Sequence, residues 1–200
     1  AVQAILQSME TSSDDYLDHA LCYALIDIAD ADGTLAGLSS RSSLVRRLSL
    51  VALDRMGARL AFKQVLPLLD TEDTALKRAA LEVAGRHPDW AKNIANLLDS
   101  WLKIKNPDPN YRAMLRGAIK AFIADPGVRS VVARHLEDEA SPAPKLASLL
   151  DAIARSGSTG LPAEWARGFR EVLDRDDEAL QGQAVSTLRA VGETGFRARL

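Results

Sequence analysis

The sequence predicts an all-α fold made of repeated pairs of helices. Three observations lead to this prediction: an apolar pattern that recurs at a nearly fixed interval, acidic residues placed where helices would begin, and glycine and proline residues between the periodic segments. No segment shows a sustained alternation of polar and apolar residues with β-branched side chains, so no strand is expected.

The recurring pattern is an anchor residue, a small or apolar residue three positions later, and an apolar pair at positions seven and eight. Its copies are Leu17/Ala20/Ala24/Leu25, Val45/Leu48/Ala52/Leu53, Leu76/Ala79/Val83/Ala84, Tyr111/Met114/Ala118/Ile119, Leu180/Gln183/Thr187/Leu188, and a less regular copy anchored at Lys145 that ends in Leu150, Ala152 and Ile153. The anchors are separated by 28, 31, 35, 34 and 35 residues. These offsets share one helix face, and a near-fixed period is typical of stacked repeats. The pattern therefore predicts a right-handed α-α superhelix, an α-solenoid, of about six helical hairpins.

Each hairpin is expected to hold a first and a second helix. The expected first helices cover residues 2–9, 60–69, 90–102, 128–136 and 165–173, and residues 31–43 predict only a short, irregular helix. Acidic residues stand three positions before four of the anchors: Asp14, Asp73, Asp108 and Asp177. A carboxylate at that position can accept the free N–H groups of the first helical turn. These residues are therefore predicted to begin the second helices of their hairpins.

The composition favours thin helical layers in one domain that spans residues 1–200. Hydrophobic residues make up 47% of the chain and aromatic residues only 5%, so Leu, Ala and Val are expected to form the core. No apolar run approaches roughly eighteen residues and no signal peptide is recognisable, so no membrane insertion is expected. Periodic apolar residues at both ends suggest a domain excised from a longer protein. The single cysteine, Cys22, is predicted to be a buried, inert thiol.

A family resemblance rests on residues 42–53, 73–84 and 108–119, in which an apolar anchor, one or two basic residues and a small apolar pair follow one another. These segments resemble the second helix of HEAT repeats, especially the short bacterial kind found in phycobilisome-lyase-type arrays. The resemblance implies an armadillo-like helical scaffold whose second helices form a concave surface for protein binding.

A shorter segment, residues 19–28, resembles the HEAT portion of large exported bacterial proteins that join a sugar-dehydrogenase-like propeller to a c-type cytochrome module. That resemblance would place the chain in the periplasm; otherwise a cytoplasmic location is equally open. No Cys-x-x-Cys-His motif occurs in the sequence. Any haem would therefore be attached elsewhere in such a protein, and no cofactor is expected on this chain.

Basic residues recur one repeat apart at the start of the expected second helices. They are Arg46, Arg47, Lys77, Arg78, Arg112 and Arg116. Such a stripe could bind an acidic protein partner or a neighbouring domain of the parent chain. Alternatively, these residues pair with Asp14, Asp73, Asp108 or neighbouring carboxylates in a ladder between repeats, which would set register and contribute little stability.

The charge distribution argues against a nucleic-acid partner. The formal net charge is −2, and the first forty residues contain acidic groups but no Lys or Arg. Residues 41–63 reverse the sign, with Arg41, Arg46, Arg47, Arg55, Arg59 and Lys63 against Asp54. A nucleic-acid groove needs a continuous basic surface, whereas this charge alternates along the chain and is better suited to docking of a protein domain, or is simply solvated.

No motif for catalysis or metal binding is present. The three histidines, His19, His87 and His135, are not followed by Glu and show no i, i+4 pair, so surface or helix-terminal positions are expected for them. Trp90 and Trp101 share a helix face and are predicted to pack in the core, while Trp165 is predicted to be partly exposed. The sequence thus favours a non-catalytic interaction scaffold or interdomain spacer. An accessory lyase or another enzyme that uses the groove as a substrate cradle stays open as the alternative.

Overall fold

The computed structural model describes residues 1–104 and 111–193. These residues form twelve α-helices and three short 3-10 helices, and no strand occurs among them. The chain divides into two compact units, Ala1–Arg86 and His87–Leu200. Each unit contains three consecutive helical pairs, so the predicted all-α class and six hairpins are confirmed. The prediction that residues 1–200 act as a single domain stays a prediction.

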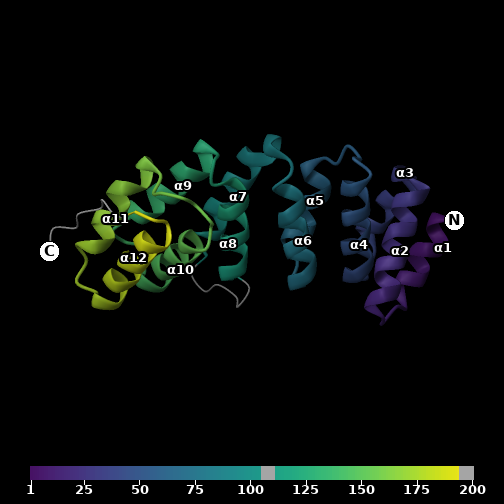
Figure 1. The fold of residues 1–200 in the computed structure, drawn as a ribbon, viewed down its shortest axis with the longest axis horizontal. Coiled ribbons are helices and arrows are strands. Elements are labelled where there is room, and N and C mark those ends of the chain that lie inside the picture. The colour runs from purple at the N-terminus through teal and green to yellow at the C-terminus, as the bar shows by residue number, and fades with distance from the viewer. Residues whose placement is uncertain (105–110, 194–200) are drawn as a thin grey trace. The chain divides into compact units, whose positions relative to one another are not determined.

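Unit 1 (Ala1–Arg86) stacks its second helices side by side. Its elements are α1 (Val2–Glu10), α2 (Asp15–Ile28), α3 (Ala31–Leu35), η1 (Ala36–Ser39), α4 (Ser43–Arg55), α5 (Phe62–Leu69) and α6 (Thr74–Ala84). Helix α4 packs between α2 and α6, and each second helix also contacts the first helix of its own pair (Figure 1). The first helix of the middle pair is short and breaks into α3 and η1, as the sequence predicted.

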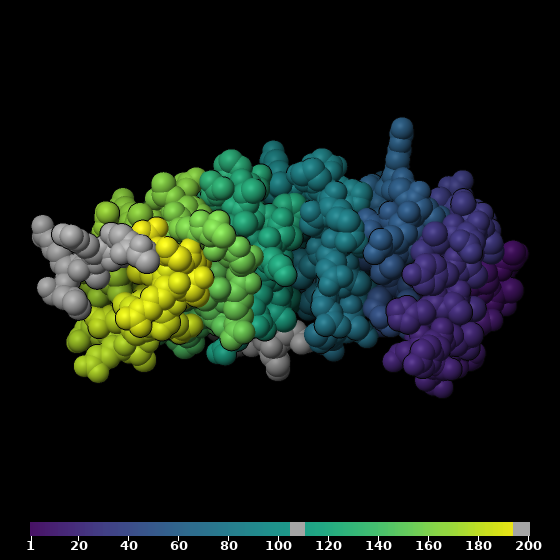
Figure 2. Space-filling model, viewed as in Figure 1, coloured from purple at the N-terminus to yellow at the C-terminus, as the bar shows by residue number. Residues whose placement is uncertain are grey.

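Unit 2 (His87–Leu200) has the same organisation with two rows of helices. Its elements are η2 (Pro88–Trp90), α7 (Ala91–Trp101), α8 (Tyr111–Phe122), α9 (Pro126–Glu137), α10 (Ala143–Ala154), η3 (Ala163–Trp165), α11 (Ala166–Leu173) and α12 (Glu178–Ala190). The second helices α8, α10 and α12 pack in one row, and the first helices α7, α9 and α11 in the other. In Figure 2 the successive pairs of each unit appear as adjacent bands of colour.

Three second helices, α2, α6 and α12, begin at predicted carboxylates. The side chains of Asp14, Asp73 and Asp177 accept the backbone N–H of Tyr16, Leu76 and Leu180, at 2.8, 2.8 and 2.9 Å. Ser42 caps α4 in the same way, through the N–H of Val45. The predicted cap at Asp108 lies outside the described residues. These bonds satisfy backbone donors that have no partner inside the helix.

The core follows the recurring pattern fully in the second, third and fourth copies, while Lys145 of the fifth copy and Gln183 of the sixth are half-buried. The anchors Val45, Leu76 and Tyr111 and their pattern partners are all buried. In α2, however, Leu17 is 45% exposed and Ala20 is also exposed, while Cys22 and Leu25 are buried. The predicted inward face of α2 is therefore wrong. The reason is that α1 and α4 both pack on the side of α2 that carries Cys22 and Leu25.

Two glycines of unit 2 test how closely its pairs are packed. A Cβ on Gly168 of α11 would overlap the Cβ of Leu136 in α9 and lie 3.3 Å from its carbonyl carbon. A Cβ on Gly182 of α12 would meet nothing within 4 Å. We expect Gly168→Ala to lower the free energy of unfolding by about 1–3 kcal/mol through overpacking. Gly182→Ala should raise it by roughly 0.5–1 kcal/mol because alanine favours a helix interior.

The measurement is urea denaturation followed by tryptophan fluorescence, which reports on unit 2 because Trp90, Trp101 and Trp165 all lie there. Equal stability changes in the two variants would contradict the close approach of α9 and α11.

Candidate functional site

The predicted basic residues fall in both units and differ in exposure. In unit 1, Arg46 and Arg47 of α4 are half-buried and Arg78 of α6 is exposed, but Lys77 is buried, at 6% exposure. In unit 2, Arg112 of α8 is exposed and Arg116 is half-buried. The six residues are divided between the two units, and a continuous stripe through all of them stays a prediction. The burial of Lys77 leaves Arg46, Arg47 and Arg78 as the accessible cations of this set in unit 1.

Ion pairs between successive repeats are numerous in unit 2. Arg116 approaches Asp151 of the next second helix at 3.9 Å, and Asp151 also accepts from Arg155 at 2.8 Å. Among the first helices and their caps, the pairs are Arg134–Asp99, Arg129–Glu164 and Arg167–Glu137, at 3.1, 3.6 and 3.9 Å. Ion pairs between successive repeats therefore exist in unit 2, but of the two basic residues that the sequence singled out in this unit only Arg116 takes part in one within the described part of the chain.

Unit 1 differs, because most of its cations lack a carboxylate partner. Arg86 of unit 1 pairs with Asp54 at 2.6 Å. Arg46 donates instead to the Ser43 hydroxyl at 2.9 Å. Within the described ranges 1–104 and 111–193, no ion pair is formed by Arg41, Arg46, Arg47, Arg55, Arg59, Lys63 or Arg78. The carboxylates proposed as their partners, Asp14 and Asp73, are aligned with helix N-termini.

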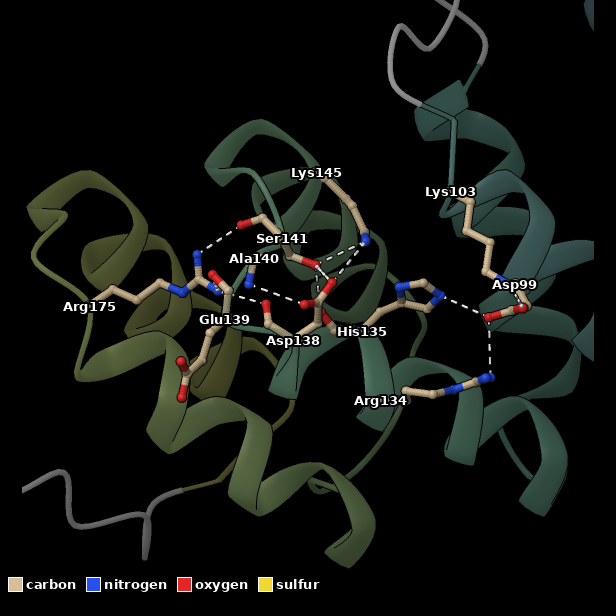
Figure 3. Close-up of polar contacts among 10 residues, drawn as sticks. All are labelled: Asp99, Lys103, Arg134, His135, Asp138, Glu139, Ala140, Ser141, Lys145 and Arg175. Atoms are coloured by element: carbon tan, nitrogen blue, oxygen red, sulfur yellow. Dashed lines mark hydrogen bonds and ion pairs between the residues drawn. The ribbon is translucent and has the colours of Figure 1, made fainter.

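A polar network links the three pairs of unit 2 (Figure 3). Asp99 of α7 accepts from Lys103 at 2.6 Å, from His135 Nε2 at 2.9 Å and from Arg134 at 3.1 Å. His135 and Arg134 belong to α9, so Asp99 ties two neighbouring first helices together. The sequence did not identify Asp99, because no local motif distinguishes it from a solvated carboxylate.

The second half of this network closes the turn between α9 and α10 (Figure 3). The Ser141 hydroxyl donates to Asp138 at 2.8 Å and accepts from Lys145 at 2.9 Å. Arg175, from the turn between α11 and α12, donates to the backbone carbonyls of Ser141, Asp138 and Glu139 at 2.8–3.0 Å. Arg175 thus joins the turn of its own helical pair to the corresponding turn of the preceding pair, where α9 has ended at Glu137 and the backbone carbonyls have no helical partner.

The electrostatics of the network follow from burial and hydrogen bonding. Burial lowers the pKa of His135 and outweighs the Asp99 hydrogen bond, which acts to raise it. The hydrogen bond from Lys103 is the main cause that lowers the pKa of Asp99. Burial likewise lowers the pKa of Lys145, and the Ser141 hydroxyl lowers that of Asp138. His135 therefore favours its neutral form in the folded protein.

The geometry of the network is structural more than catalytic. Ser141 and His135 are buried, at 3% and 6% exposure. The shallow recess beside them is lined by Ser130, Ala133, Arg134, Glu137 and Asp138, and not by Ser141, His135 or Lys145. A nucleophile needs access to its substrate, so a Ser141–Lys145 pair in this position does not offer one. Within the part of the chain that the structure describes, no group of His, Cys, Asp and Glu residues is arranged to hold a metal ion.

The tryptophans, the cysteine and His135 are all buried in the structure. Trp90 and Trp101 pack in the core as predicted, and Cys22 is buried, with its thiol pKa raised by burial. The prediction for Trp165 was wrong: it is fully buried, because its indole N–H donates to the Arg129 carbonyl of the preceding repeat at 2.9 Å. His135 lies at a helix end as expected, but it is buried against Asp99.

The search of known proteins gives no family for this chain. No protein-family model and no curated protein sequence matches it. Among solved structures it is similar to the designed armadillo repeat protein YIII(Dq)4CqI, at 14% identity and a TM-score of 0.41, over 96% of this chain and 100% of that one. It is also similar to the engineered protein OR329 of the Northeast Structural Genomics Consortium, at 16% identity and a TM-score of 0.37, over 96% of each chain. TM-scores this low do not establish a shared fold, so the helical-repeat fold of this chain is based on its own helices and their contacts.

None of the described helices is long and apolar enough to cross a bilayer.

The buried histidine predicts a pH-dependent stability of unit 2. Because the pKa of His135 is lowered in the folded state, the unfolded chain binds the proton more readily. Stability is therefore fully present above the unfolded value of about 6.5 and is lost as the pH falls toward the folded value. We expect the free energy of unfolding from urea titrations, followed by tryptophan fluorescence, to decrease between about pH 7.5 and pH 5.5.

The His135→Gln variant is the control, because glutamine can donate to Asp99 without titrating. The stability difference between the wild type and this variant should narrow as the pH falls. Parallel curves for the two proteins over this range would show that His135 is not the responsible group.

Proposed function

We propose that this chain is a non-catalytic HEAT-like scaffold, or interdomain spacer, whose unit 1 binds an acidic protein partner or an acidic neighbouring domain of its parent chain. The supporting observation is the contrast in charge pairing. Unit 2 compensates many of its cations with carboxylates of adjacent repeats, whereas Arg46, Arg47 and Arg78 of unit 1 have no ion pair among the described residues. Unpaired cations on a folded surface attract an acidic partner and set its orientation.

Neighbouring aromatic residues support the same proposal. On α2, which packs beside α4, Tyr16 is 87% exposed and Tyr23 is 65% exposed. Arg47 lies close enough to α2 to lower the pKa of Cys22, although burial of the thiol has the larger, opposite effect. Tyrosine and arginine are the residues most often found at the energetic centres of protein interfaces. These two helices together therefore offer both kinds of contact.

The alternative function, an accessory lyase or another enzyme with the groove as its substrate cradle, needs accessible polar groups that converge. The densest polar cluster among the described residues is the network of Asp99, His135, Ser141 and Lys145, and its hydroxyl and imidazole groups are buried. We therefore favour binding. The HEAT type of the repeats, the parent fusion suggested by residues 19–28 and the cellular compartment belong to the proposal as hypotheses.

The test is affinity capture from an extract of the native organism, with bound proteins identified by mass spectrometry. The variant Arg47→Glu/Arg78→Glu should lose an acidic protein that the wild type retains, because both substitutions reverse charges on accessible second-helix residues. The control variant Lys92→Glu/Arg170→Glu makes the same change in net charge at exposed positions of α7 and α11. It should retain the partner.

Helical content by circular dichroism must be unchanged in both variants. Capture of the same proteins by all three chains, or of none by the wild type, would count against a basic interaction surface in unit 1 and leave the spacer role.

A further inference from the structure

A recess of about 390 Å³ lies within unit 1 between η1, α4 and α5. Its lining residues are Leu35, Leu38, Ser39, Ser40, Arg46, Lys63, Gln64 and Pro67. The volume falls within the range of roughly 300–1,000 Å³ that small-ligand sites occupy. No carboxylate is among the lining residues, and two of them are cations.

The recess has a local cause in the sequence. The first helix of the middle pair is α3, five residues long, followed by the four-residue η1. The corresponding helices before and after it, α1 and α5, have nine and eight residues in a single α-helix. Gly37 lets η1 approach α4 closely, because a Cβ there would overlap the Ser49 side chain. The recess thus lies where this first helix is broken into α3 and η1, beside α5.

Arg46 is one of the two cations that line the recess. A guanidinium carries five N–H donors, and the described residues accept one of its hydrogen bonds, at the Ser43 hydroxyl. Its Nε–H is buried without any hydrogen-bond partner. An unsatisfied buried donor of a charged group is rare and costly in folded proteins. Rotation of the guanidinium would present Nε and one terminal nitrogen as a fork that fits a carboxylate.

Lys63 of α5 supplies a second, exposed positive charge, and it has no ion pair among the described residues. Leu35, Leu38 and Pro67 form the apolar part of the wall. Ser40, one of the lining residues, donates to Glu10 at 3.4 Å. Two cations beside apolar side chains favour a ligand that joins a carboxylate to apolar groups over a bare anion such as phosphate.

We propose that this recess binds a glutamate or aspartate side chain flanked by apolar residues on an acidic protein partner. The carboxylate pairs with Arg46 and Lys63, and the apolar neighbours contact Leu35, Leu38 and Pro67. This inference rests on the proposed scaffold function and adds the chemical class of the segment recognised and the residues that recognise it. The recess involves Lys63 of α5, which lies outside the second-helix pattern found in the sequence.

The experiment is an NMR titration of the ¹⁵N-labelled chain with the blocked tripeptide Leu-Glu-Leu, with Leu-Gln-Leu as its uncharged match and inorganic phosphate as a bare anion. Leu-Glu-Leu should shift the amide signals of Ser39, Ser40 and Gln64. The affinities for Leu-Gln-Leu and for phosphate should each be at least about tenfold lower, since a hydrogen bond to a charged group contributes about that factor.

Two variants locate the site. Arg46→Gln/Lys63→Gln should weaken Leu-Glu-Leu binding at least about tenfold, whereas the control Arg41→Gln/Arg59→Gln, which removes two cations outside the recess, should leave it within about twofold. Because Arg46 is half-buried, the single variant Lys63→Gln is measured as well, and circular dichroism checks the fold of each. Equal binding of the glutamine peptide, equal or tighter binding of phosphate, or insensitivity to the recess variants would each overturn the inference.

The outcomes separate this inference from the proposed function. If the wild type and the Arg46→Gln/Lys63→Gln variant capture a partner equally well, the inference about the recess is overturned and the proposed scaffold function stands. The peptide could instead bind at the recess while the Arg47→Glu/Arg78→Glu variant still captures the same protein as the wild type. That result would support the recess as a binding site and count against the wider basic surface.

Discussion

Successive helical pairs must lie close enough for a side chain of one pair to reach the backbone of the other, and the fold of each unit depends on this constraint. In unit 2, Trp165, Gln183 and Thr187 donate to the carbonyls of Arg129, Ala147 and Leu150, which lie 36, 36 and 37 residues earlier. In unit 1, the Cys22 thiol contacts the Leu48 carbonyl at 3.7 Å. A single pair cannot bury its own apolar face, so its stability comes mainly from its neighbours. Each such bond also fixes the register in which two pairs stack.

Small residues make this approach possible and give the units their composition. The alanines Ala52, Ala84 and Ala118 of the second helices are fully buried. Gly168 brings α11 onto the backbone of α9. With alanine and glycine at such positions, few large aromatic side chains are needed to fill the core, and Trp90, Trp101 and Trp165 are among those that do. The low aromatic content of the chain is thus a consequence of how closely its helices pack.

The helix starts and most of the core could be predicted from the sequence because they depend on residues close together in the chain. Asp73 caps α6 through the N–H of Leu76, three residues later, and the burial of Leu76 follows from the apolar pattern of the same helix. The errors concern features set by a neighbouring repeat. Whether Leu17 or Cys22 faces inward depends on the positions of α1 and α4, and the burial of His135 depends on Asp99, 36 residues away. The recess could not be predicted for the same reason. The repeat pattern singled out Arg46 of α4, but not Lys63, which reaches the recess from α5.

The contrast in charge between the units follows from where their carboxylates are used. In unit 1 the side chains of Asp14, Asp30 and Asp73 accept backbone N–H groups at helix N-termini. A carboxylate held in that position stabilises its own helix. In unit 2, Asp99 and Asp151 lie inside or at the ends of helices and point toward neighbouring repeats, where cations reach them. Asp125 and Asp177 cap helices of unit 2 in the same way, so the units differ in their other carboxylates: Asp99 and Asp151 meet cations of neighbouring repeats, whereas Arg46, Arg47 and Arg78 of unit 1 meet no carboxylate among the described residues. This difference supports the proposed external acidic partner over an internal ladder as the role of the unit 1 arginines.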